Sequence, residues 1–217
     1  MGPPAHFVVA YHRHRFAALF VSLLLTMGAG STLEALAPRW NPMQILLALN
    51  LLAAIASVSH EHHMLLPLAF GVAYLVARGL LAALGVPGLL AVGDTAWVIA
   101  ILLAMAAAFR HAFRRGSVDR ERIFAALDAY LLVGLLFGMV YWMLDRFWPG
   151  SFGGAVGSSA LDLPRAIYFS FVTLATLGYG DVVPASAPAR GLAVVEGVSG
   201  QMYLAVLVAR LVSLYSR

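Results

Sequence analysis

The chain has 217 residues, of which 62% are hydrophobic and only 11% are charged, whereas about 25% of the residues in a typical soluble domain are charged. This composition excludes an ordinary soluble enzyme and predicts an integral membrane protein, and the absence of cysteine excludes a disulfide framework and a Cys-ligated metal site. The net charge is +4, but all 14 basic residues are arginines that lie mainly between apolar blocks, so no nucleic-acid partner is expected.

Apolar blocks follow one another along most of the chain. A helix that crosses a bilayer needs about 20 mostly apolar residues. Blocks that approach this length lie, in chain order, near Phe16–Gly30, Met43–Val58, Met64–Leu84, Leu89–Phe109, Ile123–Leu144 and Gly191–Leu214. They predict six transmembrane helices and therefore an all-α membrane protein.

A shorter apolar block, Leu163–Ala175, lies between the fifth and sixth of these blocks. As a helix it would be about 20 Å long, which is too short to cross a bilayer. It therefore predicts a re-entrant segment. Irregular backbone is tolerated at membrane depth only where it is buried in protein or lines a water-filled path, so the short block is the first indication of a functional site.

The arginines predict the orientation of the chain, because cytoplasmic loops carry an excess of basic residues. With both termini inside, the cytoplasmic arginines are Arg13, Arg15, Arg110, Arg114, Arg115, Arg120, Arg122, Arg210 and Arg217. Those left outside are fewer, namely Arg39, Arg146, Arg165 and Arg190. We therefore expect a multi-pass protein of the cell membrane with both termini cytoplasmic, in contact with membrane lipids. A short chain without cysteine is typical of a prokaryotic plasma membrane.

Directly after the short block the sequence reads Thr176-Leu177-Gly178-Tyr179-Gly180-Asp181. A dehydrated cation in a membrane needs oxygen atoms that replace its hydration shell, and backbone carbonyls supply them when successive residues direct their C=O groups at one axis. This arrangement needs backbone conformations that alternate between the left- and right-handed regions, and glycine reaches the left-handed region at low cost. Gly178 and Gly180 stand at the alternate positions that such a ribbon requires.

This string, with the short helix before it, resembles the pore helix and selectivity filter of the potassium channel family, in which four such loops surround an axis. The resemblance is specific over about Asp162–Pro184 and looser over the flanking spans. It implies a homotetramer that conducts K+ passively and selectively, with no cofactor and no other metal, and so a protein that is not an enzyme. From the count and placement of the spans we expect a four-helix membrane domain over residues 1–115, followed by a pore domain over residues 116–217.

The resemblance assigns roles to individual residues of the filter region. The expected ion-binding residues, through their backbone carbonyls and the Thr176 hydroxyl, are Thr176, Leu177, Gly178, Tyr179 and Gly180. The expected supporting residues are Tyr168 and Phe169, which would brace Tyr179, Asp181 at the outer end, and Asp162, which would cap the pore helix with Pro164 in its first turn. The chain departs from the family pattern at Leu177, Ala175 and Val172, where relatives carry Val, often a second Thr, and in some cases an acidic residue.

Small and polar residues in the last two spans have predicted roles as well. The resemblance suggests Gly200 as the glycine at which the inner helix bends, with close helix packing as the alternative. Gln201 and Leu204 are expected to line the cavity below the filter. Gly134 and Gly138 form a Gly-x-x-x-Gly pattern on the fifth span, which predicts a close contact between helices.

Acidic residues at membrane depth need partners. For Glu196, on the sixth span, we expect support of the filter through a salt bridge with Arg190 or Arg165. Asp128, near the inner end of the fifth span, is expected to meet the arginine-rich linker that precedes it.

The first four spans match a voltage sensor in number and placement only. A voltage sensor needs several regularly spaced arginines along one helix, and the fourth block has none between Thr95 and Phe109. We therefore expect that voltage does not gate this protein. Arg78 and Asp94 are expected to pair, because an arginine within a span requires a partner.

Alternatives of three kinds stay open at this point. The first is a weakly selective cation pore, and the second is a subunit that does not conduct and modulates a partner channel. The third is a membrane metalloprotein or enzyme that uses a histidine cluster, His60, His62 and His63. The cluster does not match the zinc-protease pattern His-Glu-x-x-His, because Met64 follows His63.

Overall fold

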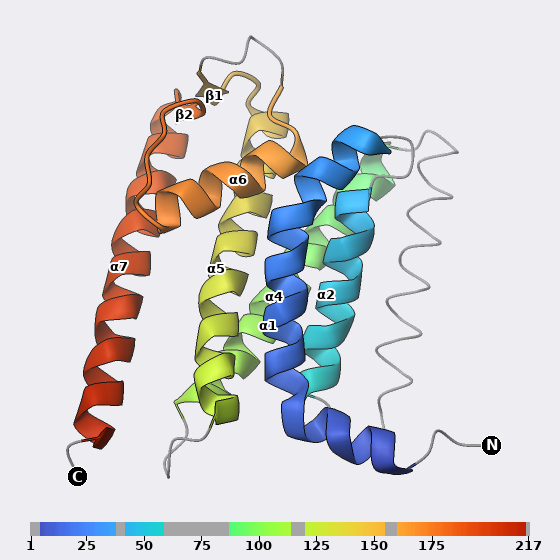
Figure 1. The fold of residues 1–217 in the computed structure, drawn as a ribbon. Coiled ribbons are helices and arrows are strands. Elements are labelled where there is room, and N and C mark those ends of the chain that lie inside the picture. The colour runs from blue at the N-terminus through green and yellow to red at the C-terminus, as the bar shows by residue number, and fades with distance from the viewer. Residues whose placement is uncertain (1–4, 38–41, 59–86, 114–119, 155–159, 216–217) are drawn as a thin grey trace. The chain divides into compact units, whose positions relative to one another are not determined.

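The computed structural model describes residues 5–37, 42–58, 87–113, 120–154 and 160–215 (Figure 1). The chain divides into two compact units, residues 1–129 and 130–217. Each unit is built from helices, and the second also contains a pair of two-residue strands.

The first unit contains α1 (Ala5–Leu36), α2 (Pro42–Val58), α4 (Pro87–Ala112) and the beginning of α5 (Arg120–Phe147). Helices are confirmed at the predicted blocks Phe16–Gly30, Met43–Val58 and Leu89–Phe109. Helices α1 and α4 extend beyond their apolar blocks, because the hydrogen bonds of a helix continue into flanking residues that accept helical geometry. The third predicted span, Met64–Leu84, lies outside the described residues.

Polar contacts join α1 to α2, which lie side by side in Figure 1. The side-chain amide of Asn50 donates a hydrogen bond of 2.5 Å to the Thr26 hydroxyl, and both residues are buried. Glu34, near the end of α1, accepts a hydrogen bond of 3.0 Å from the backbone N–H of Met43 and so satisfies a free donor in the first turn of α2. These contacts set the register of the α1–α2 pair.

Aromatic contacts join α1 to the helices that follow it in the first unit. The Phe16 ring stacks on His111 of α4 with 4.5 Å between ring centroids. Phe20 meets Phe124, in the first part of α5, with 5.6 Å between centroids. Asp128, one turn further along α5, is buried, and neither of its carboxylate oxygens has a hydrogen-bond partner among the described residues.

The second unit contains the rest of α5, then β1 (Phe152–Gly153), α6 (Leu163–Leu174), β2 (Val183–Pro184) and α7 (Ala187–Tyr215). Helices are thus confirmed at the predicted blocks Ile123–Leu144, Leu163–Ala175 and Gly191–Leu214. Within the described residues, the helices apolar and long enough to cross a membrane are α5 and α7, and six spans stay a prediction. The 12-residue α6 runs across between them (Figure 1).

The predicted close contact of Gly134 and Gly138 is confirmed, and their partner is the short helix α6. A Cβ atom on Gly134 would lie 2.5 Å from the ring of Phe171, and one on Gly138 would lie 2.8 Å from the Cα atom of Ile167. Because both glycines lack a side chain, the backbones of α5 and α6 approach closely. This contact fixes the position of α6 along α5.

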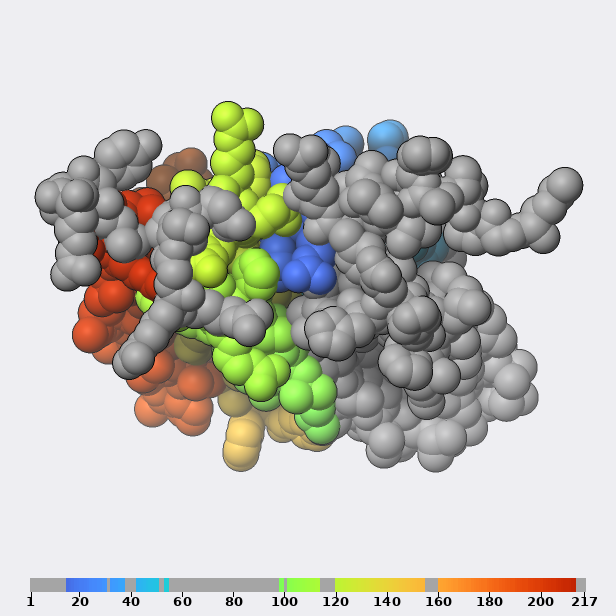
Figure 2. Space-filling view, turned by 90° about the horizontal axis from the view of Figure 1, so that it is seen from below, coloured from blue at the N-terminus to red at the C-terminus, as the bar shows by residue number. Residues whose placement is uncertain are grey.

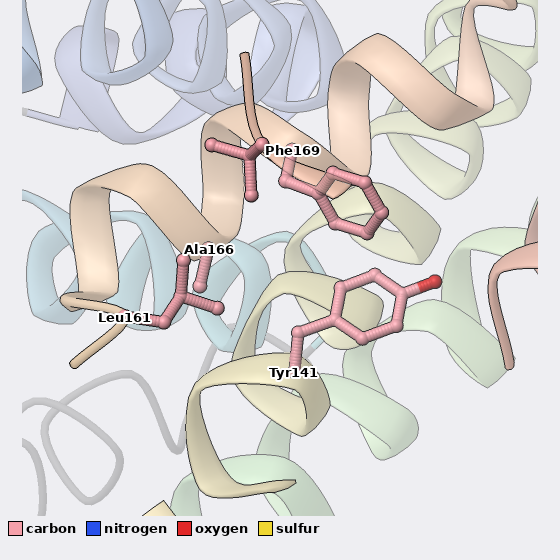
Figure 3. Packing of buried hydrophobic residues seen from close by; sticks show 5 residues of the cluster. Tyr141, Leu161, Ala166 and Phe169 are labelled. Atoms are coloured by element: carbon pink, nitrogen blue, oxygen red, sulfur yellow. The ribbon is translucent and has the colours of Figure 1, made fainter. Parts of the chain in front are cut away.

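A buried aromatic cluster closes the opposite end of the α5–α6 contact (Figure 3). The rings of Tyr141, Phe152 and Phe169 meet edge to face, with 5.1–5.3 Å between centroids. Leu161 and Ala166 pack beside Tyr141, whose hydroxyl points away from them (Figure 3). Edge-to-face pairs of this kind contribute about 0.5–1.5 kcal/mol each beyond the burial of their area.

Helix α7 contributes few side chains to the core of its own unit. Its exposed apolar residues are Val194, Val195, Val198, Met202, Val206, Val208 and Val212. The last turns of α7, red in the space-filling view, also lie on the surface (Figure 2). An apolar face of this length on a helix that can cross a membrane is suited to lipid or to other protein chains.

Candidate functional site

The short helix α6 begins at a capped end. Asp162 is its N-cap residue, and its carboxylate accepts a hydrogen bond of 2.9 Å from the backbone N–H of Arg165. Pro164 lies in the first turn, where its missing N–H leaves no helical bond unmade. The partially negative C-terminal end of the helix directly precedes residues 175–180, so a cation beside that end would be stabilised.

The carbonyl groups at the end of α6 are bonded to the loop that follows and to α5. Backbone N–H groups of Ala175, Thr176 and Leu177 donate to the carbonyl oxygens of Phe171, Thr173 and Val172, respectively. The Tyr130 hydroxyl, on α5, donates to the carbonyl oxygen of Leu174 at 3.1 Å. The Tyr130 ring stacks on Tyr203 of α7 with 5.9 Å between centroids. Sequence reasoning missed Tyr130, since nothing in the local pattern distinguishes it from other aromatic residues of a span.

The loop after α6 has a backbone that alternates in handedness. Thr176, Gly178 and Gly180 have φ angles of 57°, 63° and 79°, while Leu177 and Tyr179 between them have negative φ. This is the alternation that a carbonyl-lined ribbon requires. Thr176 was not expected in the left-handed region, which is unfavourable for a β-branched residue. Strained conformations of this kind cluster at functional sites.

The same loop is exposed on its own chain. All of residues 175–180 are exposed, with Leu177 at 57% and Tyr179 at 68%. A Cβ atom added to Gly178 or Gly180 would meet nothing within 4 Å in the described residues. The strained loop of residues 175–180 is therefore bonded to the end of α6, and no described residue covers its exposed side.

Two of the residues expected to support the ribbon, Tyr168 and Asp181, meet at its outer end, and Tyr168 also meets Tyr179. The rings of Tyr168 and Tyr179 are stacked, with 6.5 Å between centroids and an interplanar angle of 4°. The Tyr168 hydroxyl is hydrogen-bonded to the side chain of Asp181. Tyr168 thus contacts the ribbon on both sides of Gly180.

Phe169, the second expected partner of Tyr179, packs elsewhere. It is 5% exposed and lies in the aromatic cluster with Tyr141 and Phe152. Successive residues of a helix point about 100° apart, so Tyr168 and Phe169 cannot share one face of α6. In this position Phe169 shares a buried hydrophobic cluster with Val182, which follows Asp181 directly.

The segment after the ribbon is tied to the segment before α6. Strands β1 and β2 are antiparallel, with Phe152 opposite Pro184 and Gly153 opposite Val183. Beside them, Gly154 has a φ angle of 143°, and a Cβ atom there would lie 2.0 Å from the carbonyl oxygen of Asp181. Sequence reasoning missed Gly154, because a glycine within a Gly-rich loop does not reveal a long-range contact.

A buried acidic side chain also holds the segment between α5 and α6. Asp145, near the end of α5, is 3% exposed and accepts hydrogen bonds from the backbone N–H groups of Phe152 at 3.3 Å and Leu161 at 2.8 Å. The carbonyl oxygen of Ser151 accepts from the N–H groups of Ala185, at 2.8 Å, and Ser186. Asp145 was not singled out from the sequence, although an acidic residue at the end of an apolar helix is a usable signal.

Glu196, on α7, is held by hydroxyl groups where the sequence predicted an arginine. It is fully buried, and it accepts a hydrogen bond of 2.6 Å from the Tyr141 hydroxyl. Its other oxygen is hydrogen-bonded to the Ser170 hydroxyl of α6. Arg190 donates to the carbonyl oxygen of Pro184. The salt-bridge prediction is corrected because Glu196 lies on the α7 face that packs on α5 and α6, where hydroxyls are present.

The predicted contact of Asp128 is tested only in part. It was expected to meet the arginines of the preceding linker, of which Arg114 and Arg115 lie outside the described residues. Asp128 follows Arg120 by two turns of α5, about 12 Å along the axis. Its distance from the helix start explains why no hydrogen bond with a described arginine forms.

The α7 residues expected to act in gating differ in how deeply they are buried. Gly200 is buried against the end of α6, where a Cβ atom would lie 2.6 Å from the Leu174 side chain. Gln201 is exposed on this chain and Leu204 is half-buried. Close packing, one of the alternatives for Gly200, therefore has a named partner. The lining role of Gln201 and Leu204 stays a prediction.

The histidine alternative rests on His60, His62 and His63, which lie outside the described residues, as does Arg78. Asp94 lies in α4, but its side chain is not among those described. Within the described residues, no group of three or more His, Cys, Asp or Glu side chains is placed to hold a metal ion.

Known proteins are similar to the part of the chain that carries this geometry. A family model described as "Ion channel" matches residues 129–217. A curated relative, "Two-pore potassium channel 4" of Arabidopsis thaliana, is 37% identical over 83 residues, which cover 38% of this chain and 27% of the relative. The match thus spans about a quarter of the length of that relative.

The matched region contains α6, the alternating ribbon and α7, so the similarity and the geometry concern the same residues. With the apolar helices, it identifies the chain as a membrane protein with an ion channel domain. The resemblance seen in the sequence therefore has support: residues 129–217 match a family model of ion channels, and part of the chain is similar to a two-pore potassium channel.

Proposed function

We propose that this chain forms a homotetrameric, potassium-selective channel of the cell membrane that conducts K+ passively, and that it is not an enzyme. The observation that carries the proposal is the alternation of φ at Thr176, Gly178 and Gly180 on a loop that its own chain leaves uncovered. The family of residues 129–217 supports it, and so does the name of the relative from Arabidopsis.

The exposure of residues 175–180 supports assembly. One ribbon of backbone cannot surround an ion, whereas four ribbons around an axis can. Each copy of this sequence carries one Thr-Leu-Gly-Tyr-Gly-Asp string, so a closed filter needs four copies. The exposed apolar residues of α7 give the neighbouring chains a surface to pack against.

In the assembled channel the carbonyl oxygens of Thr176, Leu177, Gly178, Tyr179 and Gly180, with the Thr176 hydroxyl, replace the hydration shell of K+. The C-terminal end of α6 favours a cation on the inner side of the filter. Gln201 and Leu204 line the cavity below it. Voltage does not gate the channel, because α4 has its arginine, Arg110, only in its last turn.

The proposal is tested by assembly and by ion binding, which do not depend on an open gate. We expect the purified protein to run as a tetramer in detergent and to bind K+ in preference to Na+ by titration calorimetry. A monomer that binds neither ion would contradict the proposal, and equal binding of both ions would favour the weakly selective pore. Changing His60, His62 and His63 to Ala is expected to leave K+ binding intact.

A further inference from the structure

Three helices of the second unit meet at the carboxyl group of Glu196. Glu196 belongs to α7, Tyr141 to α5, and Ser170 to the middle of α6. All three side chains are buried. The Tyr130 hydroxyl of α5 is a further titratable group close enough to interact with Glu196. The groups that α5 and α6 direct at the carboxyl group are therefore hydroxyls.

The hydrogen bonds around Ser170 cannot all form with an ionised Glu196. The Ser170 oxygen lies 2.7 Å from the carbonyl oxygen of Gly134 and is also hydrogen-bonded to Glu196. A serine hydroxyl has one proton, and a backbone carbonyl can only accept. If Ser170 donates to Gly134, the proton between Ser170 and Glu196 must come from Glu196.

The hydrogen bond between Tyr141 and Glu196 agrees with this count of protons. The Tyr141 hydroxyl donates its one proton to the second carboxyl oxygen of Glu196. A neutral carboxylic acid therefore satisfies every contact, with one oxygen donating to Ser170 and the other accepting from Tyr141. An ionised carboxylate would leave two acceptors, Glu196 and the Gly134 carbonyl, competing for one serine proton.

We propose that Glu196 is a neutral carboxylic acid at neutral pH and that, in this form, it is a positioning residue that ties α7 to the middle of α6. The consequence for conduction rests on the proposed function. The Leu177 N–H is bonded to the Val172 carbonyl, half a turn beyond Ser170. A shift of α6 at Ser170 would therefore reach the ion-binding ribbon directly.

Ionisation of Glu196 at alkaline pH disrupts this arrangement. A buried charge without a cationic partner is unfavourable, and the Ser170 hydroxyl must turn from Gly134 to Glu196 to pair with it. We therefore expect K+ current to fall reversibly as the pH is raised into the alkaline range. Glu196→Gln keeps the hydrogen-bond pattern without a titratable group, because its amide N–H donates to Ser170 and its amide oxygen accepts from Tyr141.

The protonation state is tested by infrared spectroscopy of the protein in lipid vesicles, which does not require conduction. We expect carboxylic-acid C=O absorption at neutral pH that shifts in D2O, and one component of it should be lost in Glu196→Gln and retained in Asp128→Asn. Asp128 is the matched control because it is a second buried carboxyl group, with no hydrogen-bond partner among the described residues, and it contributes a C=O band of its own when neutral. An absorption that is unchanged in Glu196→Gln, or completely lost in Asp128→Asn, overturns the proposal.

The positioning role is tested by the pH profile of K+ flux. Wild-type flux should fall at alkaline pH, whereas the Glu196→Gln profile should be flat over the same range. Identical profiles would overturn the role of Glu196. If Glu196→Gln does not assemble, the Asp128→Asn spectrum still tests the proposal, because a complete loss of the carboxylic-acid absorption in that variant would leave none for Glu196. If no variant or wild type conducts, the infrared result stands, and only the channel proposal fails.

Discussion

Gly154 approaches the backbone of Asp181 so closely that a Cβ atom on Gly154 would lie 2.0 Å from the Asp181 carbonyl oxygen. The segment before α6 thus touches the backbone immediately outside the proposed filter. The contact needs a glycine for its space and for its φ angle of 143°. It makes the outer end of the loop sensitive to a single methyl group.

We therefore expect Gly154→Ala to displace Asp181 and to lower both thermal stability and K+ binding. The loss of stability should be about 1–3 kcal/mol, from overpacking and backbone strain. Gly153→Ala is the matched control, because a Cβ atom on Gly153 meets nothing within 4 Å and its φ is not in the left-handed region. Thermal unfolding and calorimetric titration with K+ measure the two effects. Equal behaviour of the two variants would show that the Gly154 contact has no role.

The close contact between α5 and α6 predicts how a substitution at Gly138 changes stability. Gly138→Ala should destabilise the protein by about 1–3 kcal/mol, because the added methyl group meets the Ile167 backbone, which cannot move aside as a side chain can. Gly191→Ala, at an exposed position of α7 with open space, should be neutral or stabilising by about 0.5–1 kcal/mol. Unfolding of both variants in detergent measures the difference, and a stabilised Gly138→Ala would contradict the close contact.

A double substitution separates the alternatives for Gly200. Gly200→Ala should reduce conduction and stability, since its methyl group overlaps the Leu174 side chain. Leu174→Val removes the atom that is overlapped. If close packing explains Gly200, the two substitutions should couple favourably, by about 0.5–3 kcal/mol in a double-mutant cycle. If Gly200 acts as a bend, Leu174→Val should restore neither conduction nor stability.

The Tyr168 hydroxyl can be removed without removing its ring. Tyr168→Phe keeps the stack on Tyr179 but loses the hydrogen bond with Asp181, which should lower stability. We expect weaker K+ binding and currents that decay under sustained flux, because Asp181 is released at the outer end. Tyr168→Leu, which loses the stack as well, should be more severe. Indistinguishable effects of the two would show that the stack does not contribute.

Local features of the site could be predicted from the sequence because they depend on neighbouring residues. The Asp162-x-Pro164 spacing predicts the start of α6, and the glycine spacing predicts left-handed backbone at Gly178 and Gly180. Thr176 could not be predicted in this way, since its own preference opposes the conformation that its surroundings impose.

Long-range partners were the part that the sequence could not provide. Gly134 and Gly138 predict a close contact, but not that α6 makes it. Glu196 predicts a partner, but Tyr141 and Ser170 lie 55 and 26 residues away, and hydroxyl groups are too common in the chain to be singled out. Charge complementarity predicted an arginine as the partner of Glu196. Glu196 is instead buried between three helices, at a place where the neighbouring side chains carry hydroxyl groups.

The central claim, that residues 175–180 form a potassium-selective filter, is tested most directly by the reversal potential of the reconstituted protein with K+ on one side and Na+ on the other. Gly178→Ala and Gly150→Ala form a matched pair, because both glycines have left-handed φ angles, 63° and 84°, and open space around an added Cβ atom. We predict a wild-type reversal close to the K+ equilibrium potential, retained in Gly150→Ala and lost with the current in Gly178→Ala. A wild-type reversal near zero, or equal loss in both variants, would contradict the account.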